Sequence, residues 1–367
     1  GDVRENSLRS CNDSKWELVN LPHTWNKSDV ADDTPGYYRG VGWYRKQLYI
    51  DSSAKNKVSL LYFDGANQVT ELYVNEKLVG VHKGGYTRFS FDISRYIIPG
   101  AYNLIAIKVN NSHDESIPPL SADFTFFGGI YRNLYLQIKE KTGISVADNA
   151  SDGVYIKNSA VSAQKAVINI QTLLDNGLNK SRRVEIIQTI IDPAGMEVQT
   201  SRKQLALAPN SVQTVYNNRI AIADPLLWSP DTPQLYSMKT VVRDVLTKKE
   251  LDRQLNIFGL RWFHFDPQHG FSINGRHIKL IGTNRHQCYL DKGNALPDEL
   301  HVEDIRLLKE MGGNFLRISH YPQDPLVLEM CDQLGIITSV EIPIINEITE
   351  SESFLQNSLL MAKEMVK

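Results

Sequence analysis

Residues 314–336 read NFLRISHYPQDPLVLEMCDQLGI, and this stretch carries the clearest secondary-structure signals of the chain. Phe315–Ser319 is typical of a strand. Asp324 can accept a hydrogen bond from the first turn of a helix that starts with Pro325, and Gly335 can end that helix. The apolar residues available for the buried side of the helix are Leu326, Met330 and Leu334. The stretch therefore predicts a strand, a loop and a helix in succession.

The same alternation continues on both sides of this unit. Upstream, His277–Thr283 indicates a buried strand, and a helix that ends at Gly312 and Gly313 has its apolar residues at Val302, Ile305, Leu308 and Met311. Downstream, Ile336–Ile342 indicates a third strand and Ser353–Lys367 a further helix. Strands that alternate with helices pair in parallel, as in a doubly wound sheet or a (β/α)8 barrel. These roughly 100 residues are fewer than the roughly 250 of a whole barrel.

The first two thirds of the chain show the residue pattern of β-strands instead. From Lys15 to about Lys139, apolar and polar residues alternate in short runs, which are Val58–Phe63, Glu71–Val74, Thr87–Phe91 and Leu104–Val109. This alternation is typical of an antiparallel β-sandwich. A second β-rich segment runs from Gly143 to about Ile257, and its length suits an immunoglobulin-like sandwich of roughly 100 residues. Trp228 lies in this segment between two prolines, and we expect a packed corner residue rather than an exposed sugar-stacking ring.

Composition excludes several classes of protein. The 367 residues are 42% hydrophobic and 22% charged, as in ordinary globular domains, and the length suggests two or three domains. Lys and Arg total 40 against 42 Asp and Glu, so no net field attracts a nucleic acid. No apolar run approaches the roughly 20 residues of a membrane span. The 3 cysteines are scattered and predict neither a disulfide framework nor a zinc site.

The compartment stays open from the sequence. The chain begins with Gly1 rather than Met, which fits either a processed exported protein or an engineered start, and no charged and apolar leader is present. A periplasmic or secreted protein is favoured over a cytoplasmic one on this basis.

Polar residues follow each predicted strand of the last segment. In a barrel the active site is built at the carboxyl ends of the strands, so His286, Arg317 and His320 should converge on one rim. Neutral imidazole both donates and accepts hydrogen bonds, and guanidinium donates in a fixed fork, which suits a ligand with several hydroxyl groups. The alternative is that both histidines only cap strand ends.

At these positions the chain resembles glycoside hydrolase family 2. Residues 314–322 with 331–336 are similar to the long signature of the family, although Ile318 replaces the small residue usual there, and Gly282–His286 is similar to its strand-one motif. Four upstream segments resemble its N-terminal domain: Leu21–Trp25, Gly40–Arg45, Tyr73–Asn75 and Gly84–Tyr86. The resemblance implies a multidomain β plus α/β protein: a jelly-roll β-sandwich (1–142), an immunoglobulin-like β-sandwich (143–258) and the first part of a TIM (β/α)8 barrel (259–367).

The resemblance also implies site residues. His286 and His320 match positions that contact the sugar, and Arg317 matches an arginine that supports the site. Asp123 lies in a segment, residues 123–132, that resembles the one whose aspartate reaches from the first domain into the barrel mouth. We therefore expect Asp123 to lie close to both histidines. Its alternative is a solvated loop carboxylate, but an acid among four aromatics suits a sugar site better.

No catalytic residue is assigned within the chain. The family uses one glutamate as acid/base and another as nucleophile, and both are expected beyond Lys367. Asn346-Glu347 looks like the pair that carries the acid/base, yet it follows the third predicted strand, whereas the family places that pair after the fourth. Glu341 either supports the rim or pairs with nearby arginines. The Glu-x-His pair that binds magnesium in some members has no counterpart here, so no metal or other cofactor is expected.

The leading hypothesis is retaining hydrolysis of terminal β-linked sugars, foremost β-D-galactosides, by an enzyme whose substrate-recognition part is this chain. The alternatives are a β-glucuronidase or β-mannosidase of the same family, or a non-catalytic carbohydrate-binding module. A pure binding module has no need of an incomplete barrel with exposed apolar faces and an open sheet edge. The expected partner is a carbohydrate, with homo-oligomerisation left open.

Overall fold

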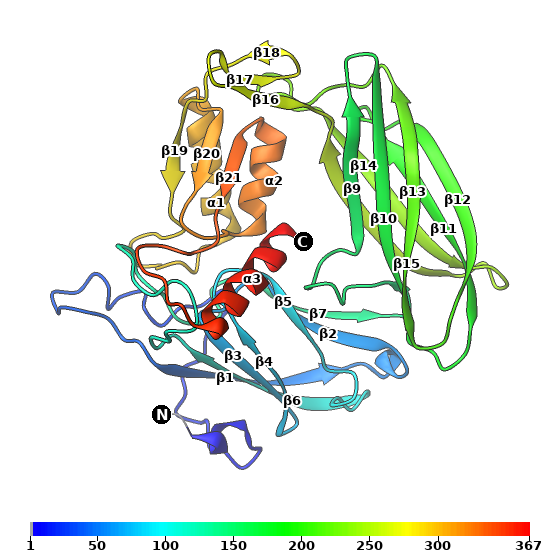
Figure 1. Ribbon diagram of the computed structural model, residues 1–367. Helices are drawn as coiled ribbons and strands as arrows, with labels where there is room; N and C mark the ends of the chain where they lie inside the picture. Colours follow the sequence, from blue (N-terminus) through cyan, green and yellow to red (C-terminus); the bar gives the residue numbers. More distant parts are fainter. Residues whose placement is uncertain (1–2) are drawn as a thin grey trace.

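The computed structural model describes residues 3–367, which fold into three units (Figure 1). The first, in blue and cyan, occupies the lower part of the view, the second, in green, stands at the right, and the third, in yellow and orange, lies opposite it. Gly1, on which the expectation of export rests, lies outside the described residues. Between residues 3 and 367, no helix has the length and apolar character needed to cross a membrane.

The first unit is an antiparallel sandwich, in which the four predicted runs fall on β2, β3, β5 and β6. One sheet has the strand order β1-β6-β3-β4 and the other the order β5-β2-β7. The strands are β1 (Val41–Ile50), β2 (Val58–Phe63), β3 (Val69–Val74), β4 (Lys77–Lys83), β5 (Phe89–Asp92), β6 (Ala101–Asn110) and β7 (Leu134–Lys139), with 3-10 turns η1 (Arg4–Ser7) and η2 (Ser52–Ala54). A long irregular segment, residues 111–133, joins β6 to β7 and reaches the third unit.

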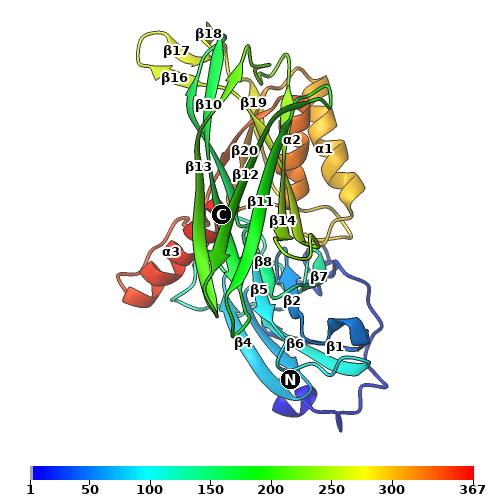
Figure 2. The same cartoon turned by 90° about the vertical axis from the view of Figure 1, so that its right-hand side faces the viewer.

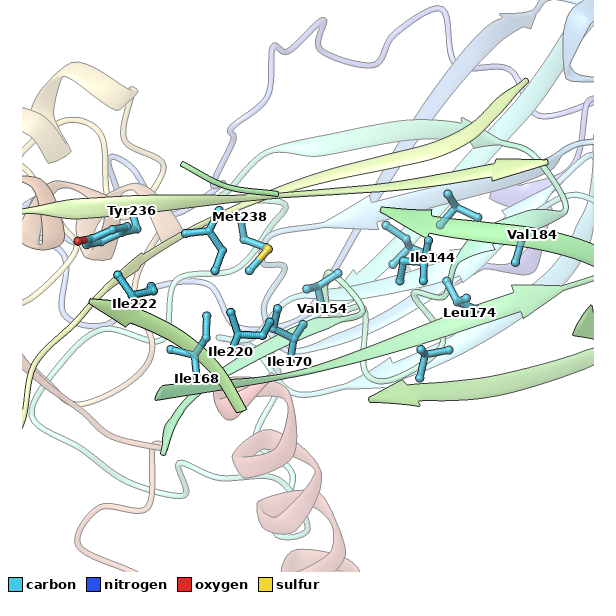
Figure 3. Close-up of a cluster of buried hydrophobic side chains, with 14 of the residues drawn as sticks. Ile144, Val154, Ile168, Ile170, Leu174, Val184, Ile220, Ile222, Tyr236 and Met238 are labelled. Carbon is cyan, nitrogen blue, oxygen red and sulfur yellow. The ribbon is translucent and has the colours of Figure 1, made fainter. Parts of the chain in front are cut away.

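The second unit is a larger sandwich. Strands β8, β9 and β13 pair with β10 in one sheet, and the other sheet has the order β12-β11-β14-β15. Their bounds are β8 (Thr142–Ile144), β9 (Val154–Val161), β10 (Lys165–Asn176), β11 (Arg182–Ile191), β12 (Glu197–Leu207), β13 (Ser211–Ala223), β14 (Leu235–Asp244) and β15 (Glu250–Gly259). Side chains of both sheets meet in one apolar core, among them Ile168, Ile170, Val184 and Met238 (Figure 3). The period of two in the sequence produces this core, because alternate residues of each strand face the same side.

Trp228 is a packed corner residue, as expected. It is 0% exposed, its indole Nε1 donates to the Asp332 carbonyl oxygen at 2.7 Å, and the Arg261 guanidinium lies 4.3 Å from its ring centroid. Since Asp332 belongs to the third unit, the tryptophan joins the second unit to the third.

The third unit is a parallel sheet with two helices on one face. An antiparallel sheet of β16 (Phe263–Asp266), β17 (Gly270–Ile273) and β18 (Arg276–His277) precedes the parallel strands β19 (Gly282–Arg285), β20 (Phe315–Ile318) and β21 (Ile337–Val340), and the helices are α1 (Asp298–Glu310) and α2 (Pro325–Leu334). Helix α2 has the predicted ends: the Asp324 carboxylate accepts from the Leu326 N–H at 3.0 Å, and Gly335 adopts φ 72°. Strands and helices share a core that includes Leu316, Ile318, Val327 and Cys331.

The expectation of one buried strand over His277–Thr283 is wrong. His277 ends β18, residues 278–281 form no strand, and β19 begins only at Gly282. Gly282, Thr283 and Asn284 are exposed. Strand β19 is an edge strand that pairs only with β20 among the described residues, so one side of it faces solvent.

Helix α3 (Glu352–Val366) confirms the predicted last helix but packs on the first unit rather than beside α1 and α2. Figures 1 and 2 show it against the first sandwich and apart from the other two helices. Its buried residues are Phe354, Ser358 and Met361. The Asn357 side chain donates to the Ser116 carbonyl oxygen at 2.6 Å, which ties the helix to the irregular segment 111–133.

Candidate functional site

Two histidines meet where the parallel strands end. Strands β19 and β20 pair in register, with Arg285 opposite Ile318, so the residues that follow them lie at the same edge of the sheet. The rings of His286 and His320 lie edge to face with their centroids 5.4 Å apart. The predicted convergence of these two residues on one rim is therefore present in the structure.

Phe124 of the first unit completes this rim. Its ring centroid lies 5.3 Å from that of His286, 6.1 Å from that of His320 and 5.1 Å from that of Tyr321. The irregular segment 111–133 thus reaches across from the first sandwich to the barrel strands. Phe124 was not predicted as a site residue, although the aromatic residues around Asp123 pointed to a sugar site.

Asp123 precedes Phe124 in the sequence, and its side chain is exposed. Its negative charge acts on His286, where it opposes the lowering of the imidazole pKa by burial and by His320. Asp123 therefore lies within electrostatic range of His286.

The pKa of His286 lies below its ordinary value, first because the ring is partly buried and then because His320 is adjacent. At neutral pH the imidazole is therefore uncharged. Its Nδ1 lies 3.3 Å from the Tyr321 hydroxyl. Burial also raises the pKa of Tyr321, so that hydroxyl keeps its proton. The second ring nitrogen of His286 is left to donate to or accept from a ligand.

Arg317 is held by Glu341. Its Nη2 donates to Glu341 Oε2 at 3.0 Å and its Nε donates to Oε1, so the pair is bidentate. The arginine holds the pKa of Glu341 below its ordinary value. His320 Nδ1 lies 3.4 Å from Arg317 Nη2 and 3.5 Å from Glu341 Oε2. Glu341 was expected either to support the rim or to pair with nearby arginines. The geometry favours the second role, in which Glu341 orients Arg317 and also lies close to His320.

Arg285 faces away from the rim although it precedes His286. It is buried beneath the sheet, where it donates to Asp304 at 2.7 Å, to Gln323 at 2.6 Å and to His301 Nδ1 at 3.1 Å. This network, like the buried Gln287 and Arg132 below the rim, was not among the residues predicted from the sequence. Buried polar residues that follow strand ends are a signal of such support, because a buried polar group needs partners.

Asn346 and Glu347 are exposed in the loop between β21 and α3. Within residues 3–367, no group of three or more His, Cys, Asp or Glu side chains could hold a metal ion.

Models of one family match successive parts of the chain. The sugar binding domain of Glycosyl hydrolases family 2 matches residues 12–140, the family model itself matches 151–261, and its TIM barrel domain matches 267–358. The chain belongs to glycoside hydrolase family 2. In this family 2 chain, Phe124 comes from the sugar binding domain, and both rim histidines come from the TIM barrel domain.

Relatives carry two different names. The chain is 37% identical to a putative β-glucuronidase of Formosa agariphila, covering 97% of this chain and 41% of that protein. It is 34% identical to a β-glucuronidase of Bacteroides fragilis (95% and 51% covered) and 35% identical to a β-galactosidase of Thermoanaerobacter pseudethanolicus (90% and 43%). The crystal structure of a Bacteroides uniformis β-glucuronidase matches with a TM-score of 0.96 at 39% identity, over 100% of this chain and 43% of that one. The chain thus spans 41% to 51% of the length of the three relatives.

Proposed function

We propose that this chain is the substrate-recognition part of a retaining β-glycosidase that removes terminal β-linked sugars. The observation that carries the proposal is the rim, where Phe124 of the sugar binding domain lies against His286 and His320 of the barrel. Two domains that contribute to one polar and aromatic rim are suited to a ligand bound between them.

The side chains at the rim fit a pyranose. The face of Phe124 offers a surface for the C–H groups of a sugar ring, and the Asp123 carboxylate can accept hydrogen bonds from hydroxyl groups. The uncharged His286 can donate or accept, whereas Arg317 only donates. Hydroxyl contacts that tighten as the ring flattens in the transition state accelerate hydrolysis, and contacts that bind both states equally do not.

We propose terminal β-glucuronides as the substrates, ahead of the β-galactosides that the sequence favoured. The support is the relatives, since the first two are named as β-glucuronidases and the β-glucuronidase of Bacteroides uniformis matches at 39% identity. The β-galactosidase relative at 35% identity keeps β-galactosides as the second candidate. Arg317 does not decide between them, because two of the five N–H donors of its guanidinium bind Glu341 and the others can bind a sugar hydroxyl group as well as a carboxylate.

The test is hydrolysis of aryl β-glycosides by the full-length protein. We expect the aryl β-glucuronide to have the highest kcat/KM, followed by the β-galactoside, with the β-mannoside slowest. A full-length protein that binds these sugars and hydrolyses none of them would favour the non-catalytic module.

Substitution of the rim histidines tests the site itself. His286→Ala and His320→Ala in the full-length protein should each lower kcat/KM about tenfold to a hundredfold, because a lost hydroxyl contact costs about 1 to 3 kcal/mol. The matched control is His269→Ala, since His269 lies in the exposed turn between β16 and β17. Wild-type kinetics in both rim variants would refute the assignment.

A further inference from the structure

A buried arginine ends the segment that carries Asp123 to the rim. Arg132 is 2% exposed and lies two residues before the start of β7 in the first sandwich. It belongs to no ladder of the sheet, and neither our sequence analysis nor the proposed function uses it.

The guanidinium of Arg132 donates hydrogen bonds into two domains. On its own side it donates from Nη1 to the carbonyl oxygens of Tyr86 at 2.9 Å and Asp64 at 3.2 Å. Toward the barrel it donates from Nη2 to Gln287 Oε1 at 3.2 Å and to the Pro322 carbonyl oxygen at 2.6 Å. All four acceptors are uncharged, so the contacts depend on the geometry of the guanidinium fork rather than on an ion pair.

The two barrel acceptors adjoin the rim histidines. Gln287 follows His286 directly and Pro322 lies two residues after His320, each in a different loop. Gln287 is itself 1% exposed, and it also accepts from the Asp324 N–H at 2.9 Å and donates to the Asn294 carbonyl oxygen at 3.1 Å. A displacement of Arg132 would therefore be transmitted to both loops.

We propose that Arg132 is a positioning residue that sets the distance between the first-domain part of the rim and the two barrel histidines. The expected effect of Arg132 on kcat rests on the proposed function. Its effect on the spacing between the two sides of the rim rests on the geometry alone. Asp123 and Phe124 lie on the segment that Arg132 ends, and the histidines lie on the loops that it binds. One side chain thus fixes both halves of the sugar site.

Lysine cannot replace this arginine. An ammonium group is a single point, whereas the guanidinium presents separate nitrogens to the two domains. Arg132→Lys keeps the charge and a donor for the carbonyl oxygens of the first domain but should lose the barrel contacts. It is therefore the decisive variant, and Arg132→Met is the more severe one. The control is Arg45→Met, because Arg45 also donates to backbone carbonyl oxygens in the first unit, those of Asn6 and Leu8. Its other partner is Asp13 at 2.8 Å, and among residues 3–367 its hydrogen bonds stay within the first unit.

The kinetic measurement uses the full-length protein. Arg132→Lys should lower kcat about tenfold to a hundredfold, because a misplacement of about 1 Å at a reacting group costs on that order. Arg45→Met should lower the melting temperature and leave kcat near that of the wild type. If Arg132→Lys retained wild-type kcat in an active enzyme, the positioning role would be overturned.

A second measurement does not depend on activity. In the 367-residue chain with carbon-13 at histidine Cε1, the titration of His286 reports the burial of its ring and its distances from His320 and Asp123, with the Tyr321 hydroxyl as its other polar neighbour. Arg132→Lys should shift the pKa of His286, because the loops that bind Arg132 set both the burial of the ring and its distances from His320 and Asp123. Arg45→Met should leave that pKa unchanged. His286→Gln assigns the signal.

The two measurements separate the two proposals. A full-length protein that hydrolyses no glycoside would refute the proposed function, and the His286 titration would then decide the role of Arg132 alone. An unchanged titration in Arg132→Lys would overturn the positioning role whatever the enzyme does.

Discussion

Two arginines at neighbouring strand ends have opposite roles, and the sheet explains why. Arg285 pairs in register with Ile318, whose side chain lies in the core beneath the helices, so Arg285 faces the helices too. Arg317 pairs with Asn284 on the other face and therefore reaches the rim. Successive side chains of a strand point to opposite faces of the sheet. The opposite directions of Arg285 and Arg317 can therefore be predicted from the sequence once Ile318 is recognised as a core residue. The hydrogen bonds of Arg285 were not predictable, because its partners Asp304 and Gln323 lie 19 and 38 residues away.

The buried His301 predicts a pH dependence of stability. Burial lowers the pKa of His301 to about 4, with Arg285 and Arg132 acting in the same direction and Asp324 and Asp304 against it. Its Nδ1 lies 3.1 Å from Arg285 Nη2, so it accepts a hydrogen bond in its neutral form. In the unfolded chain the His301 imidazole is protonated near pH 6.5, whereas in the folded chain it is protonated only near pH 4. The contribution of His301 to stability should therefore be present in full above pH 6.5. Between pH 6.5 and pH 4 the free energy of unfolding should fall by on the order of 2 to 3 kcal/mol.

His301→Gln isolates this contribution. A glutamine oxygen can accept from Arg285 but does not titrate. Urea unfolding at pH 7, 5.5 and 4.5 should show a smaller loss of stability in the variant than in the wild type. Equal losses in the two proteins would assign the dependence to other groups.

Among the elements, α2 was the most predictable and β19 the least. The ends of α2 follow from Asp324, Pro325 and Gly335, which act within one turn of the helix. The exposure of β19 depends instead on which strands lie beside it, and no residue within the strand encodes its neighbours. Of the residues predicted for the buried side of α2, Met330 is buried, whereas Leu326 and Leu334 are only partly buried. Val327 and Cys331 are the other buried residues of the helix. The helix faces both the sheet and α1, so its buried stripe is rotated from the predicted one.

Gly335 should tolerate alanine less well than Gly312 does. Both glycines have positive φ, 72° and 84°, which costs an alanine about 1 kcal/mol or more. At Gly312 an added Cβ meets nothing within 4 Å, whereas at Gly335 it would lie 2.5 Å from the Pro230 carbonyl oxygen of the second unit. Gly312→Ala should thus lower the free energy of unfolding by about 1 kcal/mol, and Gly335→Ala by about 2 to 4 kcal/mol. Equal effects in chemical denaturation would mean that this close approach adds no strain.

At the scale of the whole molecule, the place of α3 could not be read from local pattern. Ser351 at its start and the apolar residues Phe354 and Met361 predict a helix. The first unit that covers it lies far away in the sequence, since His82 and Glu364 are 282 residues apart. Family resemblance supplied the sandwich and barrel architecture, but not this contact.

Glu364 should hold α3 to the first sandwich. Its side chain is 4% exposed, its Oε1 lies 2.9 Å from His82 Nε2, and its Oε2 accepts from the Thr87 hydroxyl. Glu364→Ala leaves these buried partners without their acceptor, at a cost of about 1 to 3 kcal/mol. Hydrogen exchange should then speed up in residues 352–366 and 80–89, while Gln356→Ala on the exposed side of the helix changes neither segment. Unchanged exchange in Glu364→Ala would show that apolar contacts alone hold the helix.

The acidic residues near the rim decide what the 367-residue chain can do alone. Retaining hydrolysis needs one carboxyl group as acid and another as nucleophile, about 5 to 5.5 Å apart. Glu341 is unsuited to the acid role, because Arg317 keeps its pKa below the ordinary value and engages both oxygens. Glu347 is exposed in the loop after β21.

We therefore expect the 367-residue chain to bind sugar weakly and to hydrolyse no aryl β-glycoside at a measurable rate. Asp123 cannot supply the missing group merely by being acidic, since a misplacement of about 1 Å costs on the order of a hundredfold. The measurement is turnover by the purified, mass-verified chain beside binding of the same glycosides, with Asp123→Asn as the variant that should weaken binding. Turnover that disappears in Glu347→Gln would contradict this expectation, because it would make the exposed loop after β21 the source of the acid/base.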